Sequence, residues 1–221
     1  MRFYQEITLI KTPEISPYFI WSKLYTQLHL ALVEQQNLDK MVNIGVSFPE
    51  YAYQEKEGKE FASLGTKLRI FASSEQELQK LNLNKWLDRL MDYVHIKSIR
   101  PIPSNANSYL LVKRYRVTTN LERLTRRFMR RESKRTGREI SFEEAQKIQN
   151  LRFLEEKKVT LEKAKAHYTN PLVKDLPFVK IKSLSGEQEF SLLINQQPVD
   201  QQQQGSFSTY GLSSKATVPN W

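Results

Sequence analysis

Residues 3–10 read Phe3-Tyr-Gln-Glu-Ile-Thr-Leu-Ile10, and this run of aromatic, β-branched and aliphatic residues predicts a β-strand. Pro13 and Pro17 follow the strand. Apolar residues then recur at helical spacing, which predicts a helix over residues 16–36. The apolar positions of this helix are Phe19, Trp21, Leu24, Leu28, Ala31 and Leu32.

The elements predicted after this helix complete an order that is known from many RNA-binding modules. They are a strand over 43–48, a polar segment over 50–63, a strand over 66–72, a helix with a capping serine from Ser73 to Leu90, and a strand over 94–99. Strand, helix, strand, strand, helix, strand is the ferredoxin-like, or RRM-like, plan. We therefore expect residues 1–104 to form a ferredoxin-like domain.

The second half of the chain predicts a separate α/β domain. Residues 100–108 contain two prolines and several turn formers, which is typical of a linker. The spacing of Thr119 and Glu122 matches a capping box, and it predicts a helix over about 119–135. Further predictions are a weak strand over 109–117, a helix-rich, charge-balanced insertion over 141–167, and a strand pair over 178–182 and 190–194. The fold class is thus α+β, with domains at 1–104 and 105–221.

The positive charge is concentrated in one short segment. Residues 113–138 hold eleven Lys or Arg against two acids, and so carry nearly all of the formal charge of +10. On the helix predicted there, Leu121, Leu124 and Phe128 form a narrow apolar stripe opposite a comb of arginines. The stripe suits docking on a domain better than membrane insertion, so we expect a nucleic acid and no membrane. A folded RNA such as a short hairpin is favoured over DNA.

Several classes of chemistry are disfavoured. The chain of 221 residues has no cysteine, so thiol catalysis, disulfides and zinc ribbons are excluded. Its glycines match neither a dinucleotide fingerprint nor a phosphate loop. The three histidines, His29, His95 and His167, have no metal-ligand spacing, so we expect no metal and no cofactor. No signal peptide or membrane span is recognisable, and we expect a cytoplasmic protein.

To cleave RNA, the protein need only deprotonate and align the 2′-hydroxyl beside each phosphate, because this hydroxyl is itself a nucleophile. One histidine can deprotonate it near neutral pH. His29 is the best candidate, since it lies one position off the apolar stripe of its helix. The alternative is a boundary histidine with a structural hydrogen bond. From pattern alone Ser183, Ser185 and Tyr210 are ordinary polar residues near turns, and Phe190 is a core aromatic.

Five blocks of sequence resemble one known family over most of the chain. The CRISPR precursor-RNA processing endoribonucleases of subtype I-F, the Csy-type enzymes that cut the repeat hairpin, show similar blocks in the same order. The blocks here are 23–33 (Lys-Leu-Tyr-Thr-Gln-Leu-His-Leu-Ala-Leu-Val), 43–49 (Asn-Ile-Gly-Val-Ser-Phe-Pro), 120–131 (Asn-Leu-Glu-Arg-Leu-Thr-Arg-Arg-Phe-Met-Arg-Arg), 176–179 (Leu-Pro-Phe-Val) and 210–213 (Tyr-Gly-Leu-Ser).

The resemblance implies roles for particular residues. His29 would be the general base, Ser183 would orient the nucleophile with Ser185 as a nearby second hydroxyl, and Tyr210 would support the histidine. Phe190 would stack beneath the terminal base pair of the stem. The RNA-binding arginines would be Arg114, Arg116 where the family has glutamine, Arg123, Arg126, Arg127, Arg130 and Arg131.

The resemblance also implies a metal-independent cut at the base of the hairpin, with 2′,3′-cyclic phosphate and 5′-hydroxyl ends. The expected partners are the repeat stem-loop and the other subunits of a type I-F effector complex, whether of a defence system or of a transposon. The protein would stay on its product there. The alternative is a catalytically silent subunit that only binds the hairpin.

Overall fold

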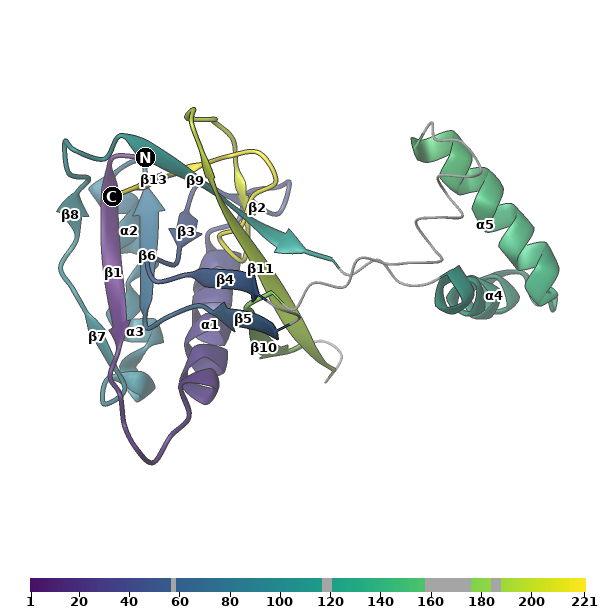
Figure 1. The fold of residues 1–221 in the computed structure, drawn as a ribbon, viewed down its shortest axis with the longest axis horizontal. Coiled ribbons are helices and arrows are strands. Elements are labelled where there is room, and N and C mark those ends of the chain that lie inside the picture. The colour runs from purple at the N-terminus through teal and green to yellow at the C-terminus, as the bar shows by residue number, and fades with distance from the viewer. Residues whose placement is uncertain (57–58, 117–120, 158–175, 184–187) are drawn as a thin grey trace. The chain divides into compact units, whose positions relative to one another are not determined.

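The computed structural model describes residues 1–56, 59–116, 121–157, 176–183 and 188–221 (Figure 1). The elements in chain order are β1 (Phe3–Leu9), α1 (Pro17–Glu34), β2 (Met41–Val42), β3 (Gly45–Ser47), β4 (Ala52–Lys56), β5 (Lys59–Ser63), β6 (Lys67–Ala72), α2 (Glu75–Leu81), α3 (Leu83–Trp86), the 3-10 helix η1 (Asp88–Leu90), β7 (Val94–Ile96), β8 (Arg100–Pro101), β9 (Ser108–Tyr115), α4 (Leu121–Thr136), α5 (Phe142–Lys157), β10 (Phe178–Lys182), β11 (Glu189–Val199), β12 (Phe207–Ser208) and β13 (Val218–Asn220). The protein is therefore a mixed α and β structure.

The chain divides into two compact units. The first consists of Met1–Tyr115 together with Asp175–Trp221, and the second of Arg116–Lys174. The first unit holds two larger sheets, one built from strands before residue 104 and one from strands after it, and two small sheets, β12-β2 and β4-β5. The expected domain boundary at residue 104 thus lies between the two larger sheets. The assignment of residues 1–104 and 105–221 to separate domains stays a prediction.

The first sheet is antiparallel and has the strand order β3-β6-β1-β7, with β8 also paired to β1. Its strands and the helices α1 and α2 follow one another in the order expected from the sequence. The expected capping serine of α2 is Ser74, which forms a capping box with Glu77. Ser74 Oγ accepts from the Glu77 N–H at 3.3 Å, and a Glu77 carboxylate oxygen accepts from the Ser74 N–H at 3.1 Å.

Two local predictions differ from the structure. The polar segment over 50–63 contains a hairpin in which β4 pairs with β5. The helix predicted to run to Leu90 ends at Asn82, which adopts a left-handed conformation with φ of 47°. The Asn82 side chain then accepts from the Lys85 N–H and caps α3. The single predicted helix is therefore divided at Asn82, and Leu83, Leu87 and Leu90 of the following segment are buried.

The second sheet is also antiparallel, with the order β10-β11-β9-β13. The strand pair expected near the C-terminus is confirmed, since Phe178 lies opposite Leu193 and Lys182 opposite Glu189. β11 is longer than expected and continues to Val199, because its second half pairs with β9.

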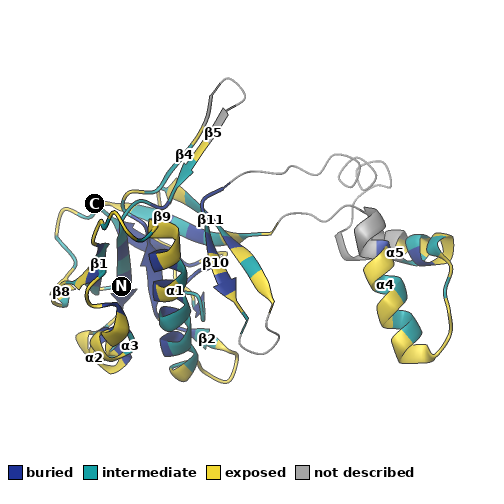
Figure 2. Ribbon diagram, turned by 90° about the horizontal axis from the view of Figure 1, so that it is seen from below, coloured by how far each residue is buried: buried dark blue, intermediate teal, exposed yellow. Residues whose placement is uncertain are grey.

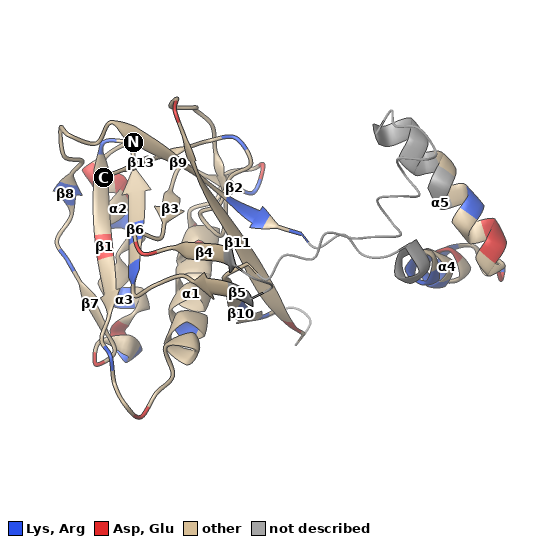
Figure 3. Ribbon diagram, viewed as in Figure 1, with Lys and Arg blue, Asp and Glu red and all other residues tan. Residues whose placement is uncertain are grey.

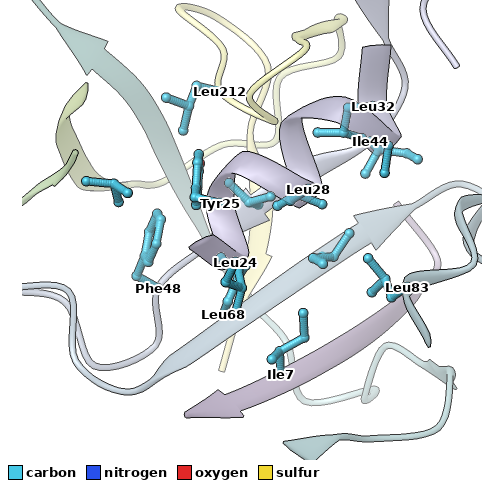
Figure 4. Packing of buried hydrophobic residues seen from close by; sticks show 14 of the residues in the cluster. Ile7, Leu24, Tyr25, Leu28, Leu32, Ile44, Phe48, Leu68, Leu83 and Leu212 are labelled. Carbon is cyan, nitrogen blue, oxygen red and sulfur yellow. The ribbon is translucent and has the colours of Figure 1, made fainter. Parts of the chain in front are cut away.

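Helix α1 joins the two sheets into one core. It lies between β6 of the first sheet and β10 of the second (Figure 1) and packs against β10. Figure 4 shows Leu24 of α1 beside Leu68 of β6, while Tyr25 faces Phe48. The face of α1 turned away from the core is exposed or intermediate in burial (Figure 2). The buried residues of α1 are Ile20, Trp21, Leu24, Tyr25, Leu28, Ala31 and Leu32.

The second unit contains α4 and α5, which pack against each other. Thr125 of α4 and Ala145 of α5 are fully buried. Helix α5 is capped by Ser141, whose hydroxyl accepts from the Glu144 N–H at 3.2 Å. The capping box expected at Thr119 lies outside the described residues. No helix in the described part of the chain is long and apolar enough to cross a bilayer.

A buried carboxylate ties three parts of the first unit together. Glu6 of β1, with its side chain 6% exposed, accepts from Arg69 Nε of β6 at 2.8 Å and from Lys97 Nζ at 2.7 Å. The Arg69 guanidinium also lies over the Trp221 ring at 4.1 Å and donates to the Trp221 carbonyl. Burial alone would raise the pKa of Glu6, but the hydrogen bonds from Lys97 and Arg69 outweigh it and hold the pKa below its ordinary value.

We expect Glu6→Gln to lower the free energy of unfolding at pH 7 by about 1 to 3 kcal/mol, because Arg69 loses its charged partner. A carboxyl with a lowered folded-state pKa stabilises the protein above its unfolded-state pKa and ceases to do so as the pH falls through the folded value. The difference from wild type should therefore shrink below about pH 4. Urea unfolding at pH 7 and pH 3 measures this. Glu14→Gln, at an exposed site, is the control, and a difference that stays constant with pH contradicts the assignment.

Candidate active site

His29 lies in the C-terminal half of α1, next to the fully buried Leu28, and is itself half-buried. Its Nδ1 is 2.9 Å from the Thr209 carbonyl oxygen. A carbonyl can only accept, so Nδ1 carries the hydrogen, and the neutral imidazole then holds its lone pair on Nε2. His29 is thus oriented as a base that can take a proton at Nε2.

The Tyr210 ring stacks on the His29 imidazole. The two centroids are 4.1 Å apart, and the ring planes differ by 9°. The face of a phenol ring carries partial negative charge, so this stack stabilises the positive charge that the imidazole acquires when it takes a proton. Burial raises the pKa of the Tyr210 hydroxyl, an effect that the charge of Arg114 partly offsets, so the hydroxyl stays protonated at neutral pH.

The segment 207–213 that carries Tyr210 is held from both sides. β12 pairs with β2, and the Val46 N–H donates to the Gly211 carbonyl at 3.0 Å. Gly211 has φ of +70°, and a Cβ there would lie 2.6 Å from Val46 Cγ1. Only glycine fits this turn, because a side chain would meet both an unfavourable backbone conformation and the packed β3 strand.

Tyr25 contacts the candidate site, and the sequence analysis did not single it out. It lies one turn before His29 in α1, is fully buried, and donates from its hydroxyl to the Tyr210 carbonyl at 2.9 Å. Burial raises the pKa of Tyr25, so this hydroxyl remains a donor. A signal was present, because a tyrosine within the apolar stripe of a helix needs a partner for its hydroxyl.

Arg114 and Phe190 are brought together by the pairing of β9 with β11. The Arg114 guanidinium lies over the Phe190 ring, 5.3 Å from its centroid. Arg114 is exposed, and its charge acts on Tyr210. The site residues thus form two contacting pairs, His29 with Tyr210 and Arg114 with Phe190.

Of the two serines expected at the site, Ser183 lies at the end of β10. Ser183 follows β10, the strand that packs against α1, and its N–H donates to the Gln188 carbonyl at 2.8 Å. β10 is tied to α1 by the Ser22 hydroxyl, which donates to the Lys180 carbonyl at 2.6 Å. Ser185 lies outside the described residues.

The expected RNA-binding arginines of the second unit lie on α4, where Figure 3 shows basic residues gathered. Arg126, Arg127, Arg130 and Arg131 are exposed, whereas Thr125 on the opposite side is buried. The side chain of Arg123 lies outside the described residues, and Arg116, at the start of this unit, is exposed. Farther along α4, the Arg135 guanidinium is paired with Glu132.

The described residues include no group of three His, Asp or Glu side chains that could hold a metal ion. What the site does contain is an oriented imidazole, a stacked phenol and an aromatic ring with an arginine beside it. These groups can move one proton and bind a phosphate and a base.

Comparison with known proteins shows the family. The family model described as CRISPR-associated protein (Cas_Csy4) matches residues 4–221. The chain is 34% identical over 220 residues to a protein of Pseudomonas aeruginosa (strain UCBPP-PA14) and 31% identical over 224 residues to one of Escherichia coli (strain UTI89 / UPEC). Each alignment covers 99% of both chains, and both relatives are named CRISPR-associated endonuclease Cas6/Csy4.

A solved structure described as "An RAMP protein binding different RNA substrates" aligns over 99% of both chains at 12% identity, with a TM-score of 0.33. The family model and the two relatives span nearly the whole sequence, including His29 and Tyr210. The chain therefore belongs to the Cas_Csy4 family of CRISPR-associated proteins.

Proposed function

We propose that this protein is a CRISPR-associated endoribonuclease that binds the repeat stem-loop of precursor CRISPR RNA and cuts at the base of the hairpin. The observation that carries the proposal is the geometry of His29, whose Nδ1 is committed to Thr209 and whose ring is stacked on Tyr210. Membership of the Cas_Csy4 family, with two relatives named as endonucleases, supports the same activity.

The proposed reaction begins when His29 Nε2 takes the proton of the 2′-hydroxyl next to the scissile phosphate. The 2′-oxygen attacks phosphorus in line, a P–O bond to the 2′-oxygen forms, and the bond to the 5′-oxygen breaks. The leaving oxygen takes a proton from water, and the hydroxide so formed takes the proton held by His29. The products are a 2′,3′-cyclic phosphate and a 5′-hydroxyl. The Tyr210 ring stabilises the imidazolium, and the Ser183 hydroxyl orients the nucleophile.

The reaction proposed here is independent of metal ions. The nucleophile is already covalently attached beside the phosphate, so it needs only deprotonation and alignment. Neither step calls for a Lewis acid, and we propose none.

Binding is assigned to α4 and to the edge formed by Arg114 and Phe190. The exposed guanidiniums of α4 suit the phosphates and guanine edges of a stem, and Phe190 suits stacking under its terminal pair. We assign residues 1–104 to a ferredoxin-like domain with the catalytic histidine and residues 105–221 to the hairpin-binding domain. The strand order β3-β6-β1-β7 supports the first assignment.

Because the binding contacts lie outside the cleaved bond, the product should stay bound. We propose that the protein remains on the mature guide RNA in the cytoplasm, as a subunit of a type I-F effector complex. The alternative is a silent subunit that binds the hairpin without cutting it. A substrate that lacks only the 2′-hydroxyl upstream of the scissile phosphate separates the two, since the proposal requires it to block a cut that occurs in chelator.

We expect His29→Ala to lower the single-turnover cleavage rate about 10²- to 10⁴-fold in the presence of a chelator, because the general base is lost. The dissociation constant for the hairpin should change little, since the phosphate contacts remain. His95→Ala, an exposed histidine of β7, is the control and should cleave normally. An equal loss of affinity in His29→Ala would give His29 a binding or structural role instead.

The double substitution Arg127→Gln with Arg130→Gln should weaken hairpin binding and flatten its dependence on salt. Each lost phosphate contact should reduce the slope of log affinity against log salt by about 0.9. Arg135→Gln is a matched control on the same helix, because its guanidinium is paired with Glu132. A titration from low to high salt measures the slopes. The assignment of α4 fails if the double variant keeps the slope of wild type.

Tyr25→Phe should reduce the cleavage rate about tenfold while RNA affinity stays unchanged. The substitution leaves the Tyr210 carbonyl without its donor and so loosens the stack on His29, a loss of about 1 kcal/mol. Tyr51→Phe removes a similar bond, from a tyrosine hydroxyl to the Ile194 carbonyl at 3.1 Å, and controls for lost stability. If both variants lose the same activity, Tyr25 has no positioning role.

A further inference from the structure

A basic depression lies along the seam between α1 and β10, outside the residues assigned to the hairpin. It has a volume of about 790 Å³. Lys23 of α1 and Lys180 and Lys182 of β10 line it, together with Tyr18 and Phe19 at one end and Thr26 at the other. All three lysines are exposed. Among the described residues of its lining, Glu189, which pairs with Lys182 across the strands, is the only acidic one.

The depression has a floor that is already formed. The Ser22 hydroxyl donates to the Lys180 carbonyl at 2.6 Å, and the Thr26 hydroxyl donates to the Ser22 carbonyl at 2.7 Å. The first bond ties α1 to β10, and the second lies within α1. Because the three lysines are exposed, their ammoniums can meet phosphate groups.

Aromatic rings complete the depression at its far end. Tyr18 is 68% and Phe19 is 54% exposed, and Lys23 Nζ lies 5.2 Å from the centre of the Phe19 ring. Exposed aromatics interleaved with cations are the pattern that binds single-stranded nucleic acid, since each base can stack on a ring while the cations hold the backbone.

The near end of the depression adjoins the catalytic residues. Thr26 lies one turn before His29 in α1, and Lys182 directly precedes Ser183. From Thr26 to Phe19 the helix extends about 10 Å. That length corresponds to about three nucleotides at a spacing of 3.4 Å. A strand that leaves the catalytic histidine along α1 would therefore cross all three lysines.

We propose that this seam binds the single strand that continues past the scissile phosphate, away from the hairpin. The inference rests on the proposed function and adds a subsite to it. An acidic protein segment would also meet the lysines, but stacking rings and direct continuity with His29 favour RNA.

Affinity measurements on uncleavable RNA test the subsite. The hairpin carries a 2′-deoxy nucleotide at the cut and is compared bare, with a short single strand past the scissile phosphate, and with the same strand attached to the 5′ end of the hairpin instead. Wild type should bind the first extended RNA at least about fivefold tighter than the bare hairpin. The strand at the 5′ end should add much less.

Lys23→Gln with Lys180→Gln should abolish this gain and leave the affinity for the bare hairpin unchanged. Lys85→Gln with Arg89→Gln is the matched control, since both cations line a neighbouring depression on the other side of Phe19 and Lys23. The control should retain the full gain.

The outcomes separate the subsite from the proposed function. Failure to bind the bare hairpin refutes the proposed function. Normal hairpin binding with no gain from the extension refutes the subsite alone, as does a gain that survives in the lysine variant. An equal loss in the Lys85 and Arg89 variant shows a general charge effect and also refutes it. If the lysine variant alters only assembly with other protein subunits, the seam is a protein interface.

Discussion

The hydrogen bond between His29 Nδ1 and the Thr209 carbonyl is the contact on which the site depends. It joins a helix near the start of the chain to a turn near its end, and it sets the tautomer that places the basic lone pair on Nε2. The turn can make this bond only because Gly211 adopts φ of +70° against β3 and because the buried Tyr25 hydroxyl holds the Tyr210 carbonyl. Tyr25, Tyr210 and Gly211 thus together fix the position of the His29 imidazole.

Helix α1 makes this arrangement possible, because it is shared by both sheets. Its apolar face fills the core between them, and its ends remain tied to β10 and to the turn that carries Tyr210. The catalytic histidine therefore lies on a rigid element rather than on a loop, which favours a precise geometry. The same helix exposes Phe19 and Lys23 on its outer side, so one element can contribute to both proton transfer and strand binding.

Charge is divided between the two compact units in a way that fits distinct tasks. The first unit buries its main ion pair, Glu6 with Arg69, as a structural tie. The second unit exposes a row of arginines on α4. Buried charge stabilises a fold only when it is fully paired, whereas exposed guanidiniums remain available to phosphate. Lys23, Lys180 and Lys182 of the seam are likewise exposed charges, and they lie near the half of α1 that carries His29.

The sequence alone determined the order of the main strands and helices of the first sheet, the helix that carries His29, a capping serine before α2 and the location of the positive charge. These features are local, because periodicity, caps and composition are properties of neighbouring residues. Resemblance to a family further predicted His29, Tyr210, Arg114 and Phe190 as site residues, and in the structure His29 stacks on Tyr210 and Arg114 lies over Phe190. Only the tertiary structure revealed the role of Tyr25, the break at Asn82 and the basic seam between α1 and β10. Lys23 and Lys180 are far apart along the chain, and no sequence pattern links them. They line the same depression because α1 and β10 bury their apolar faces against each other, a constraint set by packing across the whole core.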